Sequence, residues 1–264
     1  MSQRFFVSTP ITQDTILLGG DEGHHLARVM RAKPGDRIVL FDGGGAEYVA
    51  CVLSVGRDAV ELQVLQRREA NRESRRFVVL GVALPKGDRQ RFLVEKAVEL
   101  GVARLVPLET RRGVAQPTAS ALARLERAVV EASKQCGRNR LMEIATPIEA
   151  AQFFAAAPST ALCMLAHPGG EPLARVIGAV GNAGSTPANR IGTGNEPDSS
   201  PDAGAALHRE EIFLAVGPEG GFTDEEAVAA ASAGWHTVSL GPRILRVETA
   251  ALALAAWCVL GEQE

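Results

Sequence analysis

Two short segments near the carboxyl end of the sequence contain the residues whose types and spacing are best suited to binding a ligand or catalysing a reaction. Residues 217–221 read GPEGG and follow the apolar run IFLAV, and residues 241–246 read GPRILR. Each segment stands between an expected strand and an expected helix. In an open α/β sheet, such turns lie at the carboxyl edge of the strands, where ligands bind. The two segments therefore predict a small-molecule site.

The charges near the first segment indicate what kind of molecule it would bind. Its glycines let the backbone approach a ligand closely. Such glycine-rich turns often bind a phosphate group. However, the segment has no Lys followed by Ser or Thr, and it lacks the spacing of a dinucleotide fingerprint. Glu219, Asp224, Glu225 and Glu226 would repel a phosphate, so a cationic or neutral ligand fits better. On composition alone, a glycine-rich turn with a solvated Glu219 is the alternative.

The composition is typical of a soluble globular protein. The chain has 264 residues, of which 46% are hydrophobic and 22% are charged, so it allows one large or two modest domains. No apolar run reaches the ~18 residues that span a membrane, and the first residues lack the apolar core of a signal peptide. The four cysteines have no paired spacing, which favours buried free thiols over a zinc site. We therefore expect a cytoplasmic protein without a membrane partner or a bound metal.

Charge is distributed unevenly along the chain. Residues 1–140 hold 23 Lys and Arg against 16 Asp and Glu, whereas residues 141–264 hold 5 against 15. This asymmetry predicts a first part that faces nucleic acid and a second part that binds a small ligand. A solvated basic face is the alternative interpretation.

The first 70 residues predict short strands joined by tight turns, a pattern typical of a small β-barrel. The expected strands are residues 4–7, 38–41, 46–55 and 59–65, and a short helix is expected at residues 21–31. The polar residues 71–76 are expected to link this domain to the rest of the chain.

Residues 77–264 predict strands that alternate with helices, which indicates a parallel sheet with helices on its faces. The expected strands are residues 77–84, 102–108, 161–166, 212–216 and 237–240. The expected helices are residues 88–100 and 118–136, one that begins at a capping box formed by Thr223 and Glu226, and residues 249–260. Residues 181–209 have almost no apolar content and are expected to form a flexible, dispensable insertion.

Ordered motifs along nearly the whole chain resemble those of the RsmE family of bacterial methyltransferases. The amino-terminal motifs are HHLARVMR and PGDRIVLFDGGG; the central ones are KGDRQRFLVEKAVELGVARLVPL, RRG and EASKQCGRNR. The carboxyl-terminal motifs are AVGPEGGFTDEE and SLGPRILRVETAALALAAW. The resemblance implies methylation of N3 of a uridine in 16S ribosomal RNA, with S-adenosylmethionine as the donor.

The resemblance also implies a fold and an assembly. The fold would be a SPOUT-type parallel sheet whose carboxyl-terminal part forms a trefoil knot, preceded by a PUA-like β-barrel that binds RNA. The protein would be a homodimer with its cofactor site near the dimer interface. Its partner would be 16S ribosomal RNA or the small ribosomal subunit.

By the same resemblance, three loops would bind the cofactor. The implied residues are Leu165, Ala166, His167, Val216, Gly217, Pro218, Glu219, Gly220, Leu240, Gly241, Ile244, Leu245 and Arg246. The sulfonium of this cofactor is a cation, which agrees with the acidic character of the glycine-rich segment.

The implied reaction suggests roles for four charged residues. Arg243 and Arg246 could stabilise negative charge that develops on the uracil carbonyl oxygens. Glu219 and Glu248 could accept the N3 proton or orient these arginines, and the sequence does not decide between the two roles.

The expected RNA contacts are basic residues of the first half, with one histidine. They are Arg4, His25, Arg28, Arg31, Lys86, Lys96, Arg112 and Arg138. Three other functions stay open: a SPOUT methyltransferase that acts on another RNA or base, a non-catalytic RNA-binding adaptor, and a nucleotide hydrolase. The hydrolase fits least, because the glycine-rich segment has no P-loop lysine.

Overall fold

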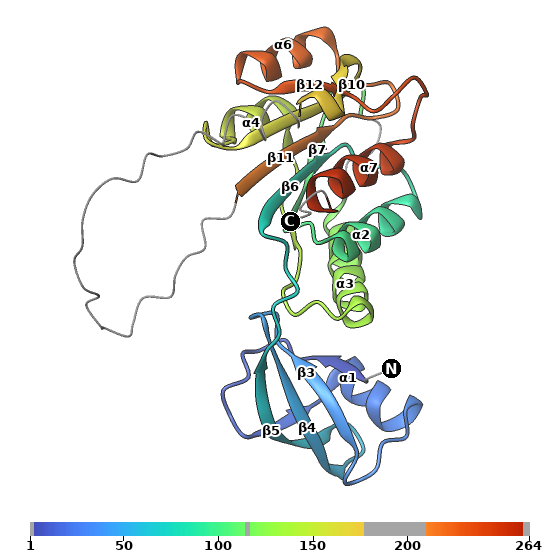
Figure 1. Ribbon diagram of the computed structural model, residues 1–264. Coiled ribbons are helices and arrows are strands. Elements are labelled where there is room, and N and C mark those ends of the chain that lie inside the picture. Colours follow the sequence, from blue (N-terminus) through green and yellow to red (C-terminus); the bar gives the residue numbers. More distant parts are fainter. Residues whose placement is uncertain (1–2, 114–116, 177–209, 261–264) are drawn as a thin grey trace, which may run out of the picture.

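The computed structural model describes residues 3–113, 117–176 and 210–260. Within these ranges the chain forms two sheets, a small one near the amino terminus and a larger one that carries most of the helices (Figure 1). The insertion expected at residues 181–209 lies outside the described residues.

The amino-terminal sheet has five strands in the order β1-β3-β4-β5-β2. Their bounds are β1 Arg4–Phe6, β2 Thr15–Leu18, β3 Arg37–Phe41, β4 Ala46–Val55 and β5 Val60–Glu69. The hairpin expected between the two long strands is confirmed, whereas β2 was not anticipated. Among the described residues no ladder joins β1 to β2, so the expected barrel is open between these strands.

A short helical segment closes one side of this sheet. It consists of α1, Gly20–His24, followed by one π-helical turn, η1, His25–Val29, so the expected helix ends two residues early. Leu26 of this turn is fully buried with Phe5, Ile38 and Leu62, and these apolar side chains form the core of the domain.

The larger sheet confirms the expected alternation of strands and helices. Its strands follow the order β12-β10-β11-β6-β7-β8, with β9 paired to β7, and all its ladders are parallel. The strand bounds are β6 Arg76–Val82, β7 Arg104–Glu109, β8 Glu143–Ile144, β9 Ile148–Glu149, β10 Leu162–Pro172, β11 Glu210–Val216 and β12 His236–Ser239. β10 runs six residues beyond the end that the sequence predicted.

Helices cover both faces of the sheet. Their bounds are α2 Arg89–Leu100, α3 Ala119–Cys136, α4 Ala150–Ala156, α6 Asp224–Ser232 and α7 Val247–Leu260. Val78 and Leu80 of β6 pack with α2, α3 and α7, while Val79 packs on the other face with α4 and α6. The continuous apolar run of β6 is therefore buried on both faces, as its composition predicted.

One close packing contact explains a glycine in β6. A Cβ on Gly81 would lie 2.4 Å from the ring of Phe153 in α4, a helix that sequence analysis missed. Any larger residue at Gly81 would displace this ring.

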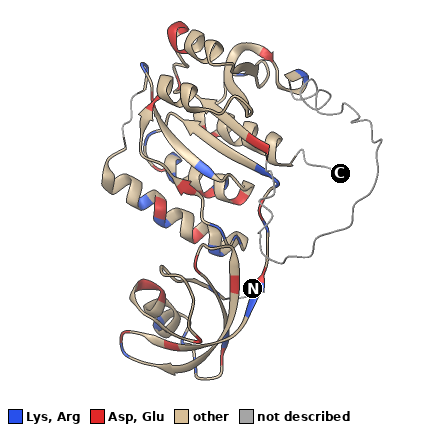
Figure 2. Cartoon of the chain, turned by 90° about the vertical axis from the view of Figure 1, so that its left-hand side faces the viewer, with Lys and Arg blue, Asp and Glu red and all other residues tan. Residues whose placement is uncertain are grey.

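Polar side chains join the two domains. The Arg138 guanidinium pairs with Glu73 at 2.7 Å and donates to the carbonyl of Val102 at 2.8 Å. Both side chains of this pair are more than nine-tenths buried. Arg4 donates to Glu47 and Asn139, and Lys134 of α3 pairs with Glu22 of α1. Figure 2 shows charged residues of both signs at this junction.

The same junction perturbs an acidic group. Burial alone would raise the pKa of Glu47, but hydrogen bonds from Arg4 and Arg72 outweigh it and hold that pKa below its ordinary value. The carboxylate therefore contributes stability at neutral pH that is lost as the pH falls through its lowered pKa.

The cysteines are free, and burial raises the pKa of Cys163 to about 11 and that of Cys258 to about 12. Cys51 and Cys136 are only half-buried, so the expectation of buried thiols holds for two of the four. Among the described helices, none is both long enough and apolar enough to cross a bilayer.

The buried pair at the junction predicts a large loss of stability on substitution. Arg138→Ala leaves the Glu73 carboxylate buried without its cation, which we expect to cost about 3–5 kcal/mol. Urea-induced unfolding measures this loss. The matched control is Arg104→Ala, which breaks an exposed pair with Glu143 and should cost less than about 1 kcal/mol. Equal losses in the two variants would contradict the structural role of Arg138.

Candidate active site

Three neighbouring strands reach the edge where the site was expected; β11 and β12 end there, and β10 continues to Pro172. Ala166 of β10 is in register with Val216 of β11 and with Val238 of β12. Because these strands are parallel, the segments that follow them leave the sheet on the same side. The structure therefore brings together residues 167–170, 217–221 and 240–246, three segments that are far apart in the sequence.

The glycine-rich turn after β11 is tightly built. Gly217 is buried, and a Cβ there would lie 3.1 Å from the ring of Phe222. Gly221 has a φ of 68°, a left-handed conformation that favours glycine, and its amide donates to the carbonyl of Pro218. The capping box expected at Thr223 and Glu226 is confirmed and fixes the start of α6 directly after the turn.

A second turn, residues 110–113 after β7, holds the glycine-rich turn from the side. Arg112 donates to the carbonyl of Gly220 at 2.8 Å. The backbone amide of Arg111 donates to the buried carboxylate of Glu226 at 2.9 Å. Glu226 therefore has a second partner that the capping motif does not reveal. Arg112, an expected RNA contact, lies beside the candidate cofactor turn.

Arg89 connects two of the predicted acidic residues. Its guanidinium lies 3.1 Å from a carboxylate oxygen of Glu219 and 3.6 Å from one of Glu248. The Glu219 side chain is 48% exposed, while that of Glu248 is only 8% exposed. Arg89 was not among the site residues predicted from the sequence. Its position at the first turn of a helix that follows a buried strand was the available signal, because that turn also lies at the carboxyl edge of the sheet.

The turn between β12 and α7 presents its side chains to solvent. Gly241 has a φ of 107°, and its amide donates to the hydroxyl of Ser239. Arg243 and Arg246 are exposed, and Ile244 is 95% exposed. Glu248 lies in the first turn of α7, which begins two residues before the predicted start. The two arginines thus border the same edge as Glu219.

The extension of β10 forms the third side of this edge. His167 is half-buried, and its Nδ1 accepts the amide of Gly169. A Cβ on Gly170 would lie 2.6 Å from backbone atoms of Val238, so only glycine lets the two segments approach this closely. Leu165 is fully buried, whereas Ala166 and Leu240 are partly exposed beside it.

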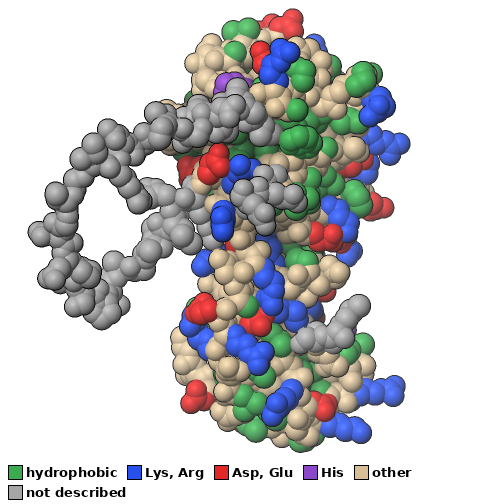
Figure 3. Space-filling view, in the orientation of Figure 1, with side chains coloured by type: hydrophobic (Ala, Val, Ile, Leu, Met, Phe, Trp, Pro, Cys, Tyr) green, Lys and Arg blue, Asp and Glu red, His purple; other side chains and the backbone are tan. Residues whose placement is uncertain are grey.

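The expected RNA contacts fall into three groups. Arg138 is buried and paired inside the protein, so its assignment as an RNA contact was wrong. The Arg4 side chain is 10% exposed and is engaged with Glu47, and Lys96 pairs with Glu99 on the outer side of α2. The remaining residues are exposed: His25, Arg28, Arg31, Lys86 and Arg112. Figure 3 shows Lys and Arg side chains over the amino-terminal domain and the junction.

The charges at the edge suit an organic ligand that carries both signs. Glu219 offers a half-exposed carboxylate, and Arg243 and Arg246 offer two exposed cations. Among the described residues there is no cluster of three or more His, Cys, Asp or Glu side chains that could hold a metal ion. Open backbone at the glycines supplies hydrogen-bonding groups.

Comparisons with known proteins agree with this geometry. A family model described as an RNA methyltransferase domain matches residues 72–259, and one described as an RNA methyltransferase PUA domain matches residues 18–65. The chain resembles a solved ribosomal RNA small subunit methyltransferase E of Neisseria gonorrhoeae bound to S-adenosyl methionine. The TM-score is 0.79 and the identity 29%, over 98% of each chain.

Relatives of known name point the same way. The ribosomal RNA small subunit methyltransferase E of Synechocystis sp. is 32% identical over 242 residues, which cover 91% of this chain and 71% of the relative. The protein of the same name from Bacillus subtilis is 28% identical over 95% of this chain and 93% of its own length. The chain therefore belongs to the ribosomal RNA small subunit methyltransferase E family of RNA methyltransferases.

Proposed function

We propose that the protein transfers the methyl group of S-adenosylmethionine to N3 of a uridine in 16S ribosomal RNA of the small ribosomal subunit. The observation that carries this proposal is the meeting of residues 167–170, 217–221 and 240–246 at one edge of the sheet. The names of the relatives and the cofactor bound in the Neisseria structure support the same chemistry.

The three segments fit this cofactor. Among the described residues, no atom stands within 4 Å of where a Cβ would lie on Gly221 or Gly241, so a ligand can reach the backbone there. Backbone groups of the three segments would bind the adenine edge and the carboxylate, with the partly exposed Leu240 on the apolar side. When bound, the cofactor supplies a methyl group on a cationic sulfonium. Glu219 provides the opposite charge.

Methylation at N3 requires that this nitrogen lose its proton. Holding N3 in line with the methyl group is the larger contribution, up to roughly 7–11 kcal/mol for well-oriented reactants. A positioned base adds about 10²–10⁴-fold. Glu219 is half-exposed and can receive the proton, whereas Glu248 is buried behind Arg89. We therefore assign proton acceptance to Glu219 and the positioning of Arg89 to Glu248.

The two exposed arginines would stabilise the reacting base. Loss of the N3 proton spreads negative charge over the uracil carbonyl oxygens, and fixed cations lower the energy of that charge. Arg243 and Arg246 are exposed at the same edge and free of ion pairs within the described chain. Arg246 stands directly before α7, where its carbonyl accepts the amide of Ala250.

The course of the chain supports a carboxyl-terminal knot. β12 lies at the edge of the sheet beside β10, yet α7, which follows it, packs with Val78 and Leu80 of β6. The connecting residues 240–246 must therefore pass back across the sheet edge before α7 docks. We infer that this passage threads the trefoil knot typical of SPOUT methyltransferases.

Exposed apolar side chains support a homodimer. Phe92 of α2, Ile244, and Trp257 and Leu260 of α7 are between 48% and 95% exposed. Apolar side chains gathered near a site mark protein interfaces, and a pairing of two identical copies is the commonest assembly. We propose that this surface joins two copies near the cofactor segments.

Loss of the gene should remove one methylated nucleoside from the small subunit. Mass spectrometry of nuclease-digested 16S ribosomal RNA from a deletion strain should lack one 3-methyluridine that the parent strain contains. The wild-type gene should restore it. Arg246→Ala should not restore it, although circular dichroism should show that this variant is folded. Loss of a different nucleoside, or full restoration by Arg246→Ala, would contradict the proposal.

The position of Arg89 predicts weaker cofactor binding without it. Arg89→Gln removes the cation between Glu219 and Glu248, so the glycine-rich turn is no longer tied to α2 and α7. Calorimetry should show affinity for S-adenosylmethionine lower on the order of tenfold, about 1.4 kcal/mol. Glu99→Gln, which breaks an exposed pair on the same helix, is the control and should bind normally. Normal binding by Arg89→Gln would argue against its positioning role.

A further inference from the structure

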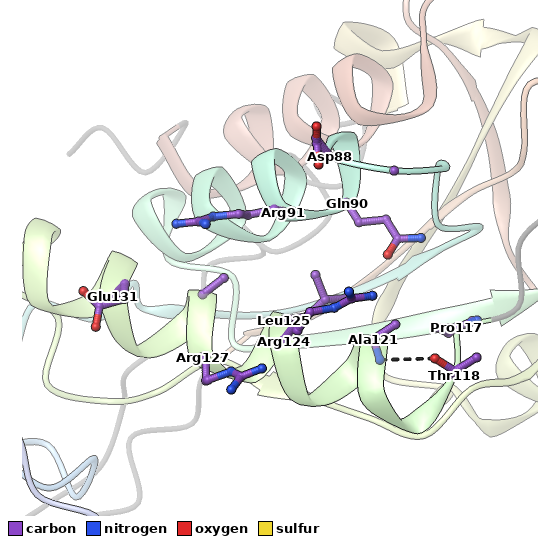
Figure 4. A pocket seen from close by; sticks show the side chains of 12 residues that line it. Asp88, Gln90, Arg91, Pro117, Thr118, Ala121, Arg124, Leu125, Arg127 and Glu131 are labelled. Atoms are coloured by element: carbon purple, nitrogen blue, oxygen red, sulfur yellow. Dashed lines mark hydrogen bonds between the residues drawn. The ribbon is translucent and has the colours of Figure 1, made fainter. Parts of the chain in front are cut away.

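A groove between α2 and α3 has no role in the site described so far. Its volume is about 710 Å³, which is typical of ligand sites. Figure 4 shows Gln90 reaching from α2 toward α3, with the side chain of Arg124 below it. The groove lies beside the cofactor edge, because Asp88, which lines its upper end, precedes Arg89 of the Glu219 pair.

The lining of the groove is rich in arginine. Arg91 enters from α2, and Arg124 and Arg127 enter from α3, against the acids Asp88 and Glu131. Arg91 pairs with Glu95, whereas Arg124 and Arg127 make no ion pair within the described chain. The first turn of α3 contains no acidic residue, so the positive end of its helix dipole adds to the positive charge there, whereas Asp88 stands directly before α2.

This chemistry suits a phosphate backbone. Guanidinium groups bind phosphate oxygens through paired hydrogen bonds. No aromatic side chain lines the groove, so it offers no surface on which a base could stack. A strand that lies in the groove would therefore be held through its phosphates, with its bases directed outward.

The direction of α3 connects the groove to both functional parts of the molecule. At its carboxyl end, Lys134 pairs with Glu22 of the amino-terminal domain. Thr118 at its amino end lines the groove near residue 88. The helix has 18 residues and is therefore about 27 Å long. It thus spans the distance between the PUA-matched domain and the cofactor edge.

We propose that the α2–α3 groove binds the phosphate backbone of the ribosomal RNA strand that leads from the amino-terminal domain to the target uridine. The inference rests on the proposed function. Arg124 and Arg127 are the residues that hold this strand, and the charge of Arg91 is shared with Glu95.

The test compares two variants of the full chain in binding to a 16S ribosomal RNA transcript. Arg124→Gln/Arg127→Gln should lower the affinity on the order of tenfold at about 0.1 M KCl. The slope of log K against log [KCl] should become shallower by about 1.4, because each lost single-strand phosphate contact removes about 0.7. Glu126 is exposed on the same helix but does not line the groove. Glu126→Gln should therefore lower neither the affinity for the transcript nor the steepness of the salt dependence. Calorimetry should give the double variant the wild-type affinity for S-adenosylmethionine.

An unchanged affinity and slope in the double variant would overturn the inference. The inference would also be overturned if the groove bound only a small anion. In that case the double variant would lose the ability to bind ATP, while its affinity for the transcript would stay normal. Failure of the proposed function is distinguishable, since it would appear as wild-type protein that binds the transcript yet transfers no labelled methyl group to small subunits.

Discussion

The parallel pairing of β10 with both β11 and β12 is the constraint on which the site depends. The register that places Ala166 beside Val216 and Val238 makes three separate turns emerge at one edge. Parallel strands need long connections, so these turns meet only through pairing between distant parts of the chain. The close approach of Gly170 to Val238 adds a requirement for glycine at the same edge.

Charge balance at that edge depends on side chains from other parts of the chain. Arg89 stands between the half-exposed Glu219 and the buried Glu248, and Arg112 donates to the carbonyl of Gly220. A buried carboxylate is costly without a cation, so these arginines make an acidic cofactor turn compatible with a packed domain. Two further arginines of this edge, Arg243 and Arg246, are exposed to solvent.

Local features of the sequence predicted much of this structure. Apolar runs predicted most of the strands, though not β2, β8 or β9, and Thr118 and Thr223 marked the starts of two helices because capping is a local interaction. Predictions from local sequence patterns were wrong where residues far along the chain determine the structure. Arg138 was assigned to RNA because its partner Glu73 could not be seen, and Arg89 was missed because both of its acidic partners lie far along the chain. The extension of β10 depends in the same way on contacts with β12.

In the proposed function, the carboxylate of Glu219 stabilises a positively charged methyl donor. Calorimetry of Glu219→Gln with S-adenosylmethionine and with S-adenosylhomocysteine, its uncharged thioether product, tests this most directly. For a half-exposed carboxylate the attraction is worth about 1 kcal/mol or more, so affinity for the sulfonium should fall at least about fivefold. The loss of the Arg89 contact affects both ligands alike, so the affinity for the uncharged thioether should fall less than that for the sulfonium, by a factor of at least about five. Equal losses for the two ligands, or no loss for either, would contradict the account.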